Sequence, residues 1–238
     1  MKEFADIHIH LLPGVDDGAK NMEDAVKMLE AAKRDGTTVF CLTPHFHPGM
    51  FGNNHEAVMR SFQELRIIAE EQFPEVQLYL GNELRYSPNC LSWLQQEMCL
   101  TMNGTDCVLV DFMEDEDQKV ITDAVYRLLN AGYQPILAHV ERYRSLRRDC
   151  REILQYKNAG ALIQIDGFSL FGGWGVSAKL RSRRLIEHKL VDLVCSDAHG
   201  IGARPPQLSQ AYEYIKQRCG EKYADSILYE NAKNCLQI

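Results

Sequence analysis

Long apolar runs and a signal peptide are both missing from this chain of 238 residues. No apolar stretch approaches the roughly 20 residues that span a bilayer, so a membrane-spanning helix is excluded. The amino terminus enters a strand-like segment without the apolar core of a signal peptide. We therefore expect a cytoplasmic location and no stable insertion into a membrane.

Blocks of like charge are also missing. The formal net charge is -7, and charged residues make up 25% of the chain without gathering into a basic segment. Because binding to a phosphate backbone needs a basic face, this balance argues against nucleic acid as the main partner.

Paired cysteine motifs are absent, although cysteine itself is not. The eight cysteines form no CxxC pair, and several lie inside apolar runs such as residues 39–42 and 193–195. We therefore expect reduced cysteines in the core rather than disulfides or a zinc knot. Cysteine-dependent tyrosine phosphatases need an arginine in the loop after the catalytic cysteine, and the loop from Cys195 to Gly200 has none.

Short apolar runs alternate with amphipathic stretches along the whole chain. The runs predict seven strands, over residues 5–9, 37–42, 76–80, 107–112, 135–138, 161–165 and 191–195. One predicted helix begins after the N-cap Asn21 and stops at Gly36. The other predicted helices cover residues 56–73, 117–131, 149–159, 176–189 and 206–219.

This alternation predicts an α/β fold with a parallel sheet of repeated βα units. No linker, repeat or low-complexity tract interrupts the chain, so residues 1–238 are expected to form a single domain. The longer irregular segments all follow strands, at residues 11–20, 44–54, 83–89 and 168–175. In a barrel they would share the face that carries active sites, whereas a doubly wound open sheet, the alternative, normally gathers its ligands at one switch point.

Residues of metal-ligating type recur where the predicted strands end. His8 and His10 lie two apart on a strand, so their imidazoles point the same way, which suits a divalent metal. The full set of such residues is His8, His10, Asp17, His45, Glu83, Asp111, His139, Asp197 and His199. The set predicts a multinuclear metal site in a hydrolase, and imidazole with carboxylate favours manganese, iron or zinc over a cysteine zinc site.

Other polar residues near these positions have simpler interpretations. His55 and His188 lie in predicted helices and are expected at the surface, while His47 either touches a substrate or is solvated in its loop. Asp166 ends the sixth strand and is expected to support the site without binding metal. The aromatic residues on the same loops could pack against a phenyl ring or cap the barrel mouth; they are Phe46, Phe51, Tyr86 and Phe168.

Several short motifs follow one another in a specific order. They are Asp-Ile-His-Ile-His at 6–10, Val-Asp-Asp-Gly at 15–18, Gly-Met-Phe at 49–51, Ala-His-Val-Glu-Arg-Tyr at 138–143, Ser-Asp-Ala-His at 196–199 and Arg-Pro-Pro at 204–206. With these motifs the chain resembles, over essentially its full length, the polymerase-and-histidinol-phosphatase (PHP) metallohydrolase superfamily. It is most similar to the bacterial protein-tyrosine phosphatase branch that acts beside the tyrosine kinases of capsule and exopolysaccharide synthesis.

The resemblance implies a distorted (β/α)7 TIM-like barrel with two or three divalent transition-metal ions, manganese being the first choice. It implies that His8, His10, Glu83 and Asp197 surround one metal, that Glu83 bridges to a second held by Asp111 and His139, and that Asp17, His45 and His199 hold a third. The branch usually has Glu on the fourth strand, where this chain has Asp111. A carboxylate one methylene shorter is expected to loosen the second metal or admit a water.

The implied activity is metal-dependent hydrolysis of phosphotyrosine on proteins, with an autophosphorylated bacterial tyrosine kinase as the expected substrate. Three divalent cations contribute about +6 and four carboxylates about -4, which leaves about +2 to attract a phosphate dianion. Arg142 and Arg204 follow predicted ligands closely and are expected to contact the phosphoryl oxygens as catalytic residues.

Two other functions stay open. One is a small-molecule phosphatase of histidinol-phosphatase type. This function is less favoured, because the chain has no long insertion that could cover a small substrate. The other is a non-catalytic metal-binding regulatory module, against which the complete ligand set argues. The sequence does not determine the oligomeric state.

Overall fold

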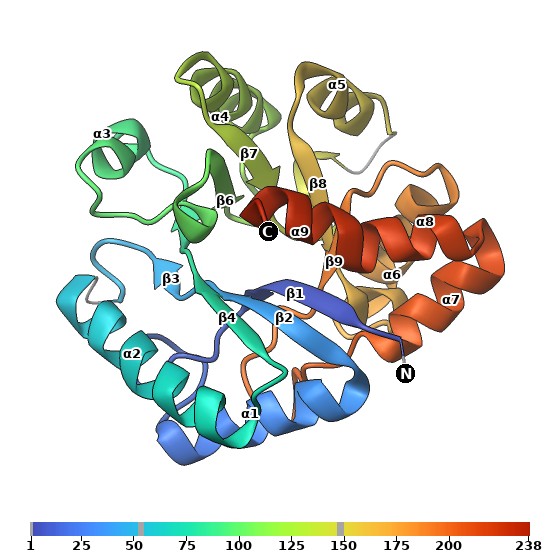
Figure 1. Ribbon diagram of the computed structural model, residues 1–238. Helices are drawn as coiled ribbons and strands as arrows, with labels where there is room; N and C mark the ends of the chain where they lie inside the picture. The colour runs from blue at the N-terminus through green and yellow to red at the C-terminus, as the bar shows by residue number, and fades with distance from the viewer. Residues whose placement is uncertain (1, 52–54, 147–149) are drawn as a thin grey trace.

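The computed structural model describes residues 2–51, 55–146 and 150–238. Its centre is a strongly curled sheet of parallel strands with helices around the outside (Figure 1). The strands are β1 (Phe4–Ile9), β2 (Thr37–Leu42), β3 (His45–Phe46), β4 (Gln77–Leu80), β5 (Glu83–Arg85), β6 (Cys107–Asp111), β7 (Gln134–Leu137), β8 (Leu162–Asp166) and β9 (Leu193–Cys195). The predicted parallel α/β arrangement is confirmed.

Two short interruptions divide the sheet into the orders β1-β2-β4 and β3-β5-β6-β7-β8-β9. β3 continues β2, and β5 continues β4, after two residues in each case. Backbone hydrogen bonds run across both interruptions, because Gly81 N donates to Leu42 O (2.9 Å) and Glu83 N donates to Pro44 O (3.1 Å). The interruption leaves His45 and Glu83 directly opposite each other in the register of β3 and β5.

The end of the β9 segment returns to β1, which already pairs with β2. Asp197 N donates to His8 O (2.9 Å), and His10 N donates to Ala198 O (3.0 Å). Ile9 also forms a parallel bridge with Ala198. The carboxyl ends of the first and last strands therefore meet.

The helices are α1 (Met22–Asp35), α2 (His55–Gln72), α3 (Cys90–Gln95), α4 (Gln118–Asn130), α5 (Arg151–Ala159), α6 (Gly175–Glu187), α7 (Ser209–Cys219), α8 (Glu221–Asp225) and α9 (Asn231–Leu236). Short 3-10 helices are η1 (Met102–Gly104), η2 (Val140–Arg142), η3 (Arg144–Leu146) and η4 (Gly167–Phe171), and η5 (Ser226–Glu230) is a π-helix. Within the described residues, no helix has the length and apolar character that crossing a membrane requires.

Helix α1 matches its prediction because local capping sets both ends. The Asn21 side chain accepts a hydrogen bond from Asp24 N (2.9 Å). Gly36 follows the last turn with φ of 114°, and a Cβ at this position would lie 2.6 Å from Lys2 O. Glycine is the residue that fits there without strain.

Some predicted boundaries were wrong. The helix predicted over 206–219 begins at Ser209, because Asp35 Oδ2 accepts hydrogen bonds from Leu208 N (2.6 Å) and Ser209 N (2.8 Å). The segment 83–89, predicted as irregular, begins with β5, which is too short for its alternation to be seen. The helix predicted over 149–159 begins at Arg151, and residue 149 lies outside the described residues. The C-terminal helices α8 and α9 and the short α3 were not predicted.

Helix α9 closes the amino-terminal end of the sheet (Figure 1). Its Ala232, Cys235 and Leu236 pack with interior residues of the strands. The loop before β6 holds the helix end, because Asn103 Nδ2 donates to Leu236 O (3.0 Å) and Thr105 Oγ1 donates to Cys235 O (2.9 Å). The opposite, carboxyl-terminal end carries the long irregular loops.

The cysteines contribute to this packing, as predicted. Among the described residues no disulfide is formed, and six of the eight cysteines are buried. Cys41, Cys107, Cys195 and Cys235 belong to the interior cluster that α9 completes.

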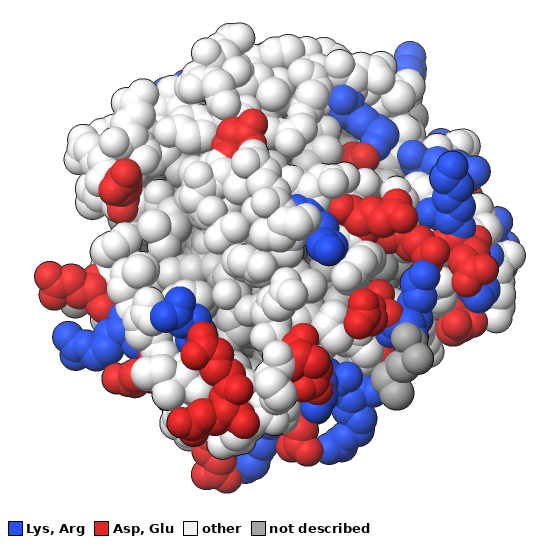
Figure 2. Space-filling view, viewed as in Figure 1, with Lys and Arg blue, Asp and Glu red and all other residues white. Residues whose placement is uncertain are grey.

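The face that carries α9 has much uncharged surface, with acidic and basic side chains interleaved along its lower and right edges (Figure 2). On this side of the molecule Lys2 pairs with Asp225 at 2.6 Å and Lys216 pairs with Glu221 at 2.8 Å. Exposed pairs of this kind contribute little to stability, so they do not mark a functional site.

Candidate metal centre

All nine predicted ligands lie at the carboxyl ends of the strands or in the loops just beyond them. Those on strands are His8 in β1, His45 in β3, Glu83 in β5 and Asp111 at the end of β6, and those on loops are His10, Asp17, His139, Asp197 and His199. In a curled parallel sheet these ends share one face, so residues far apart in the sequence meet there.

Eight of the nine form three overlapping groups in which the potential ligand atoms lie within 4.8 Å of one another. The groups are His10, Asp17, His45 and His199; His8, His10 and Asp197; and His8, Glu83 and His139. Shared members are typical of a multinuclear site. Asp111 belongs to none of the three groups.

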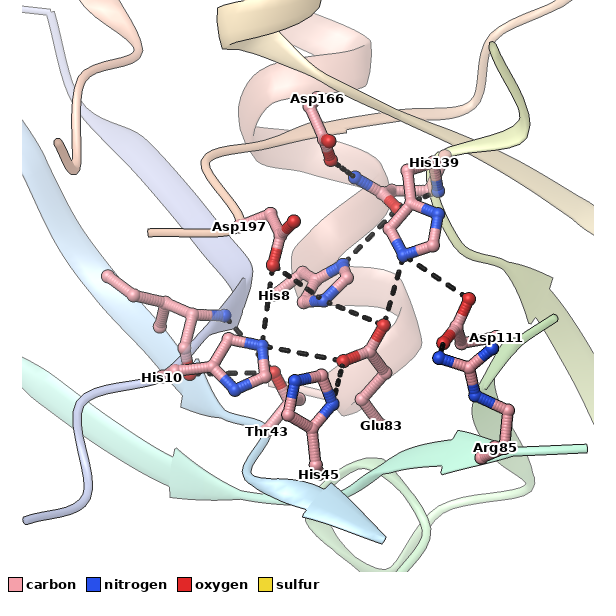
Figure 3. A network of polar contacts seen from close by, with 12 residues as sticks. His8, His10, Thr43, His45, Glu83, Arg85, Asp111, His139, Asp166 and Asp197 are labelled. Atoms are coloured by element: carbon pink, nitrogen blue, oxygen red, sulfur yellow. Dashed lines mark hydrogen bonds and ion pairs between the residues drawn. The ribbon is translucent and has the colours of Figure 1, made fainter. Parts of the chain in front are cut away.

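The Glu83 carboxylate occupies the middle of the cluster (Figure 3). Its Oε1 lies 3.1 Å from His139 Nε2 and 3.4 Å from His8 Nε2. Its Oε2 lies 2.6 Å from His45 Nδ1 and 3.5 Å from His10 Nε2. Each oxygen faces a different pair of imidazoles, which is the arrangement that a carboxylate bridging two ions requires.

The two imidazoles of the His-x-His motif each contact a polar side chain through Nδ1. His10 Nδ1 lies 2.7 Å from Asp16 Oδ2, and His8 Nδ1 lies 3.3 Å from Gln164 Oε1. Partners of this kind fix the ring orientation and leave the Nε2 lone pair available for a ligand bond.

The Nε2 atoms of these and a third histidine are available to bind a metal ion. His8 Nε2, His10 Nε2 and His199 Nε2 are buried and have no hydrogen-bond partner. Each faces a carboxylate oxygen at 3.4 to 3.5 Å. Two atoms that each lie ~2.1 Å from one ion are about 3.0 to 3.4 Å apart in octahedral or tetrahedral geometry. Spacing and donor type therefore fit divalent transition-metal ions.

The electrostatics of the cluster favour a cation. Burial alone lowers the pKa of His8, but Glu83 and Asp197 raise it to about 10. Burial likewise opposes protonation of His45, whose pKa Glu83 and Asp17 nevertheless raise to about 11. The carboxylates thus attract positive charge into a buried site, where divalent ions would replace these protons.

His139 behaves differently. Burial, reinforced by Arg142, lowers its pKa to about 3, so its imidazole is neutral at pH 7. Neutral imidazole is the form that binds a metal.

Two of the predicted ligands have a strained backbone. His139 has φ of 32° and Asp197 has φ of 50°, which non-glycine residues rarely adopt. Such conformations cost ~1–3 kcal/mol and persist only where the surroundings hold them. Gln164 Oε1 accepts from His139 N (2.6 Å), and His8 O accepts from Asp197 N (2.9 Å). The side chains of both residues belong to the cluster.

A family model described as capsular polysaccharide synthesis, CpsB/CapC, matches residues 4–237. The chain belongs to the CpsB/CapC family. Tyrosine-protein phosphatase CpsB of Streptococcus agalactiae serotype III is 32% identical over 237 residues, with 98% of each chain covered. Tyrosine-protein phosphatase YwqE of Bacillus subtilis is 32% identical over 233 residues, covering 98% of this chain and 91% of YwqE.

A solved structure is similar over the same length. It comes from work on YwqE of Bacillus subtilis and CpsB of Streptococcus pneumoniae, described as unique metal-dependent tyrosine phosphatases. The TM-score is 0.89, with 31% identity over 98% of this chain and 94% of the other. The resemblance drawn from the motifs to this branch of phosphatases is thereby confirmed.

In this member of the CpsB/CapC family, Asp111 contacts protein groups on both of its oxygens. Arg85 Nη2 lies 2.7 Å from Oδ2, and Tyr143 OH donates to Oδ1 (3.4 Å). Burial and the neighbouring Glu83 together raise the pKa of Asp111 to about 7, although Arg85 opposes the rise. The Oδ1 atom of Asp111 also lies 3.5 Å from Nε2 of His139, a predicted ligand. Because Asp111 belongs to none of the three ligand groups, its role as a metal ligand stays a prediction.

Arg142 and Arg204 lie beside the cluster. Asp197 Oδ2 is 3.3 Å from Arg142 Nη1 and 3.7 Å from Arg204 Nη1. Both arginines line a cavity of about 290 Å³ whose walls include Glu83 and His139. The cavity is therefore lined by predicted ligands and by both guanidinium groups.

The remaining candidates lie as follows. Asp166 is buried and accepts a hydrogen bond from Gln164 Nε2 (3.2 Å), outside the three ligand groups. His47 lines the cavity. His55 and His188 are exposed, as predicted.

The aromatic residues divide between the site and the scaffold. Phe51 stacks on His45 with centroids 5.1 Å apart and lines the cavity. Phe46 packs against Trp93, and Tyr86 packs against Phe112. Phe168 lies against Gly173. Of the four candidates, Phe51 lines the cavity, and Phe46, Tyr86 and Phe168 are not among the described residues that line it.

Sequence reasoning missed the residues that hold the predicted ligands. Asp16 was noted only as part of a motif, and neither Gln164 nor Arg85 was singled out. A signal for Gln164 exists, because it is a polar residue inside an otherwise apolar buried strand. Arg85 lies two residues after Glu83 on β5 and so shares its face of the sheet.

Proposed function

We propose that this chain is a metal-dependent phosphatase that hydrolyses phosphotyrosine on proteins. The observation that carries the proposal is the juxtaposition of unpartnered imidazole nitrogens with two arginines beside one cavity. The activity named for CpsB and YwqE, at about a third identity over nearly the full chain, supports it.

We further propose that the nine predicted ligands hold two or three divalent ions, manganese being the first choice and iron or zinc the others. Imidazole and carboxylate donors without thiolate support this choice. When bound, the ions supply Lewis acidity and a nucleophile derived from water.

The chain's own residues recognise the phosphate. Arg142 and Arg204 present guanidinium groups to the non-bridging phosphoryl oxygens, where charge-assisted hydrogen bonds are strongest. Phe51 and the exposed Met50 line the same cavity and offer apolar contact to a phenyl ring. The leaving phenolate, with a free pKa near ~10, needs less help from an acid than an alkoxide does.

We propose that residues 1–238 form one domain with a distorted (β/α)7 barrel. Within the described part of the chain, nine strand segments become seven when β3 is counted with β2 and β5 with β4. The hydrogen bonds across these interruptions and between β1 and the end of β9 support the count.

The family's description points to capsular polysaccharide synthesis. On this ground we propose as substrate an autophosphorylated tyrosine kinase that controls capsular or exopolysaccharide synthesis, with both proteins meeting in the cytoplasm.

The proposal is tested by assaying a phosphotyrosine peptide and histidinol phosphate side by side, with manganese and with chelator. We expect hydrolysis of the peptide, its loss on chelation and its recovery with manganese. Preference for histidinol phosphate would support the small-molecule alternative. Metal binding without turnover of either substrate would support the regulatory module.

His10→Ala and Asp197→Ala should each abolish peptide turnover without unfolding the protein, because both side chains face the cavity end of the sheet. His188→Ala, at an exposed position, is the control. If either ligand variant kept more than roughly a tenth of kcat/KM, a loss below about 1.4 kcal/mol, that residue would not be an essential ligand.

A further inference from the structure

The loop between η4 and α6 consists of Gly172, Gly173 and Trp174, and Gly175 begins α6. Gly172 has φ of 98° and Gly175 has φ of 85°, conformations that favour glycine. A Cβ on Gly173 would lie 1.9 Å from the ring of Phe168, so only glycine fits this close approach. The backbone on both sides of Trp174 therefore depends on glycine, which confines the position of the indole.

The indole of Trp174 lies against both candidate phosphate-binding arginines. Its ring centroid is 4.1 Å from Arg142 Cζ and 5.5 Å from Arg204 Cζ. Trp174 is half-buried and lines the same cavity as the two arginines. Arg142 ends η2, after β7, and Arg204 lies on the loop after β9, so one ring joins two segments of the site.

Two guanidinium groups held close together repel each other, and they need a partner that keeps them in place. Carboxylates lie near both: Asp197 contacts each arginine, Arg142 also faces Asp166 at 3.9 Å and Glu114 at 4.0 Å, and Arg204 also faces Asp17 at 3.6 Å. Asp197 and Asp17 are predicted metal ligands, and the negative charge of every one of these groups offsets the positive charge that a phosphate needs. A neutral aromatic ring attracts a cation without cancelling its charge. Trp174 meets this requirement for both arginines.

We propose that Trp174 is a positioning residue for phosphate recognition, which stacks with Arg142 and Arg204 and holds their guanidinium groups toward one phosphate monoester. This inference rests on the proposed phosphatase function. Trp174 acts through the arginines, so its effect depends on their presence.

The first test compares Trp174→Leu, Trp174→Phe and the control Val176→Ala, which alters a residue 73% exposed in the same region. Binding of inorganic phosphate to the manganese-loaded protein is measured by calorimetry, together with metal content and the kcat and KM for a phosphotyrosine peptide. Trp174→Leu should weaken phosphate binding and kcat/KM by about tenfold, as expected for the loss of two cation–π contacts. Metal content should not change.

Trp174→Phe should stay within about threefold of wild type, because it keeps an aromatic face. Val176→Ala should match wild type. If Trp174→Leu does not fold, Trp174→Met, which fills more of the volume without a ring, takes its place. Wild-type phosphate affinity in the variant without a ring, or equal losses with Phe and Leu, would overturn the assignment.

The second test is a double-mutant cycle with Arg142→Ala. If Trp174 acts through Arg142, adding Trp174→Leu to Arg142→Ala should cost about threefold or less, since only the Arg204 contact is then left to lose. If the fold-losses in phosphate affinity of the two single variants multiply in the double variant, Trp174 acts independently of Arg142, and the inference is wrong.

The two proposals can fail separately, because phosphate binding is measured without turnover. Phosphate binding that depends on Trp174, in a protein that does not hydrolyse phosphotyrosine, would overturn only the proposed function. Hydrolysis of phosphotyrosine with unchanged phosphate affinity in Trp174→Leu would overturn only the role of Trp174.

Discussion

Arg85 on β5 and Asp111 on β6 are register partners, and their side chains form an ion pair at 2.7 Å. The Asp111 side chain is almost fully buried, at 5% exposure. In the absence of metal, Arg85 is therefore the nearest cationic partner that the structure gives this carboxylate. A divalent ion bound by Asp111 would supply part of the positive charge that Arg85 otherwise provides to this carboxylate.

We predict that Arg85→Ala destabilises the metal-free protein more than the manganese-loaded protein. Leaving a buried charged group without its partner costs about 1–3 kcal/mol, and a bound cation would offset part of this cost. Urea unfolding with chelator and with manganese measures both values. Arg66→Ala, which removes an exposed helical pair with Glu70, is the control and should cost less than about 1 kcal/mol. Equal losses with and without metal would argue against Asp111 as a ligand.

Asp16→Ala should weaken metal binding or activity by about 10–100-fold while the protein remains folded. Asp16 Oδ2 contacts His10 Nδ1 (2.7 Å) and accepts a hydrogen bond from His45 N (3.0 Å), so its loss frees two predicted ligands. The affinity for manganese is measured by isothermal titration calorimetry. Glu30→Ala, which removes an exposed carboxylate from α1, serves as the control, and an Asp16→Ala affinity equal to that control would rule out the holding role.

Arg142→Ala and Arg204→Ala should each lower kcat/KM for a phosphotyrosine peptide by about tenfold to a thousandfold. A charge-assisted contact contributes roughly 1.5 to 3 kcal/mol and can strengthen in the transition state. Metal content, measured in parallel, should stay at the wild-type level because neither arginine is a ligand. Near-normal kcat/KM in both variants would mean that metals alone hold the phosphate.

Leu236→Ala should destabilise the fold by about 2–5 kcal/mol, the usual cost of removing a large buried side chain. Leu236 is fully buried in α9, at the end of the sheet opposite the candidate metal centre. The activity per folded molecule should therefore be unchanged below the unfolding transition. Denaturant unfolding measures the loss of stability, and active-site titration measures the activity per folded molecule. A fall in kcat that accompanied the loss of stability would contradict the prediction.

Much of the scaffold was predictable because its signals are local. The side chain of Asn21 and the left-handed Gly36 set the ends of α1 within a few residues of the helix itself. The start of α7 was not predictable, because its cap comes from Asp35, 173 residues away from Leu208 in sequence. The strands β3 and β5 were missed because two or three residues are too few to show alternation.

The sequence by itself determined the chemistry of the site, since residues at the ends of parallel strands share one face whatever the details of packing. Only the tertiary structure decided how that chemistry is arranged. The pairing of Arg85 with Asp111 depends on the register between β5 and β6, and the contact of Trp174 with Arg142 depends on how the loop before α6 packs against η2. Local sequence preferences act over a few residues, whereas these contacts join segments that meet only after the sheet has curled.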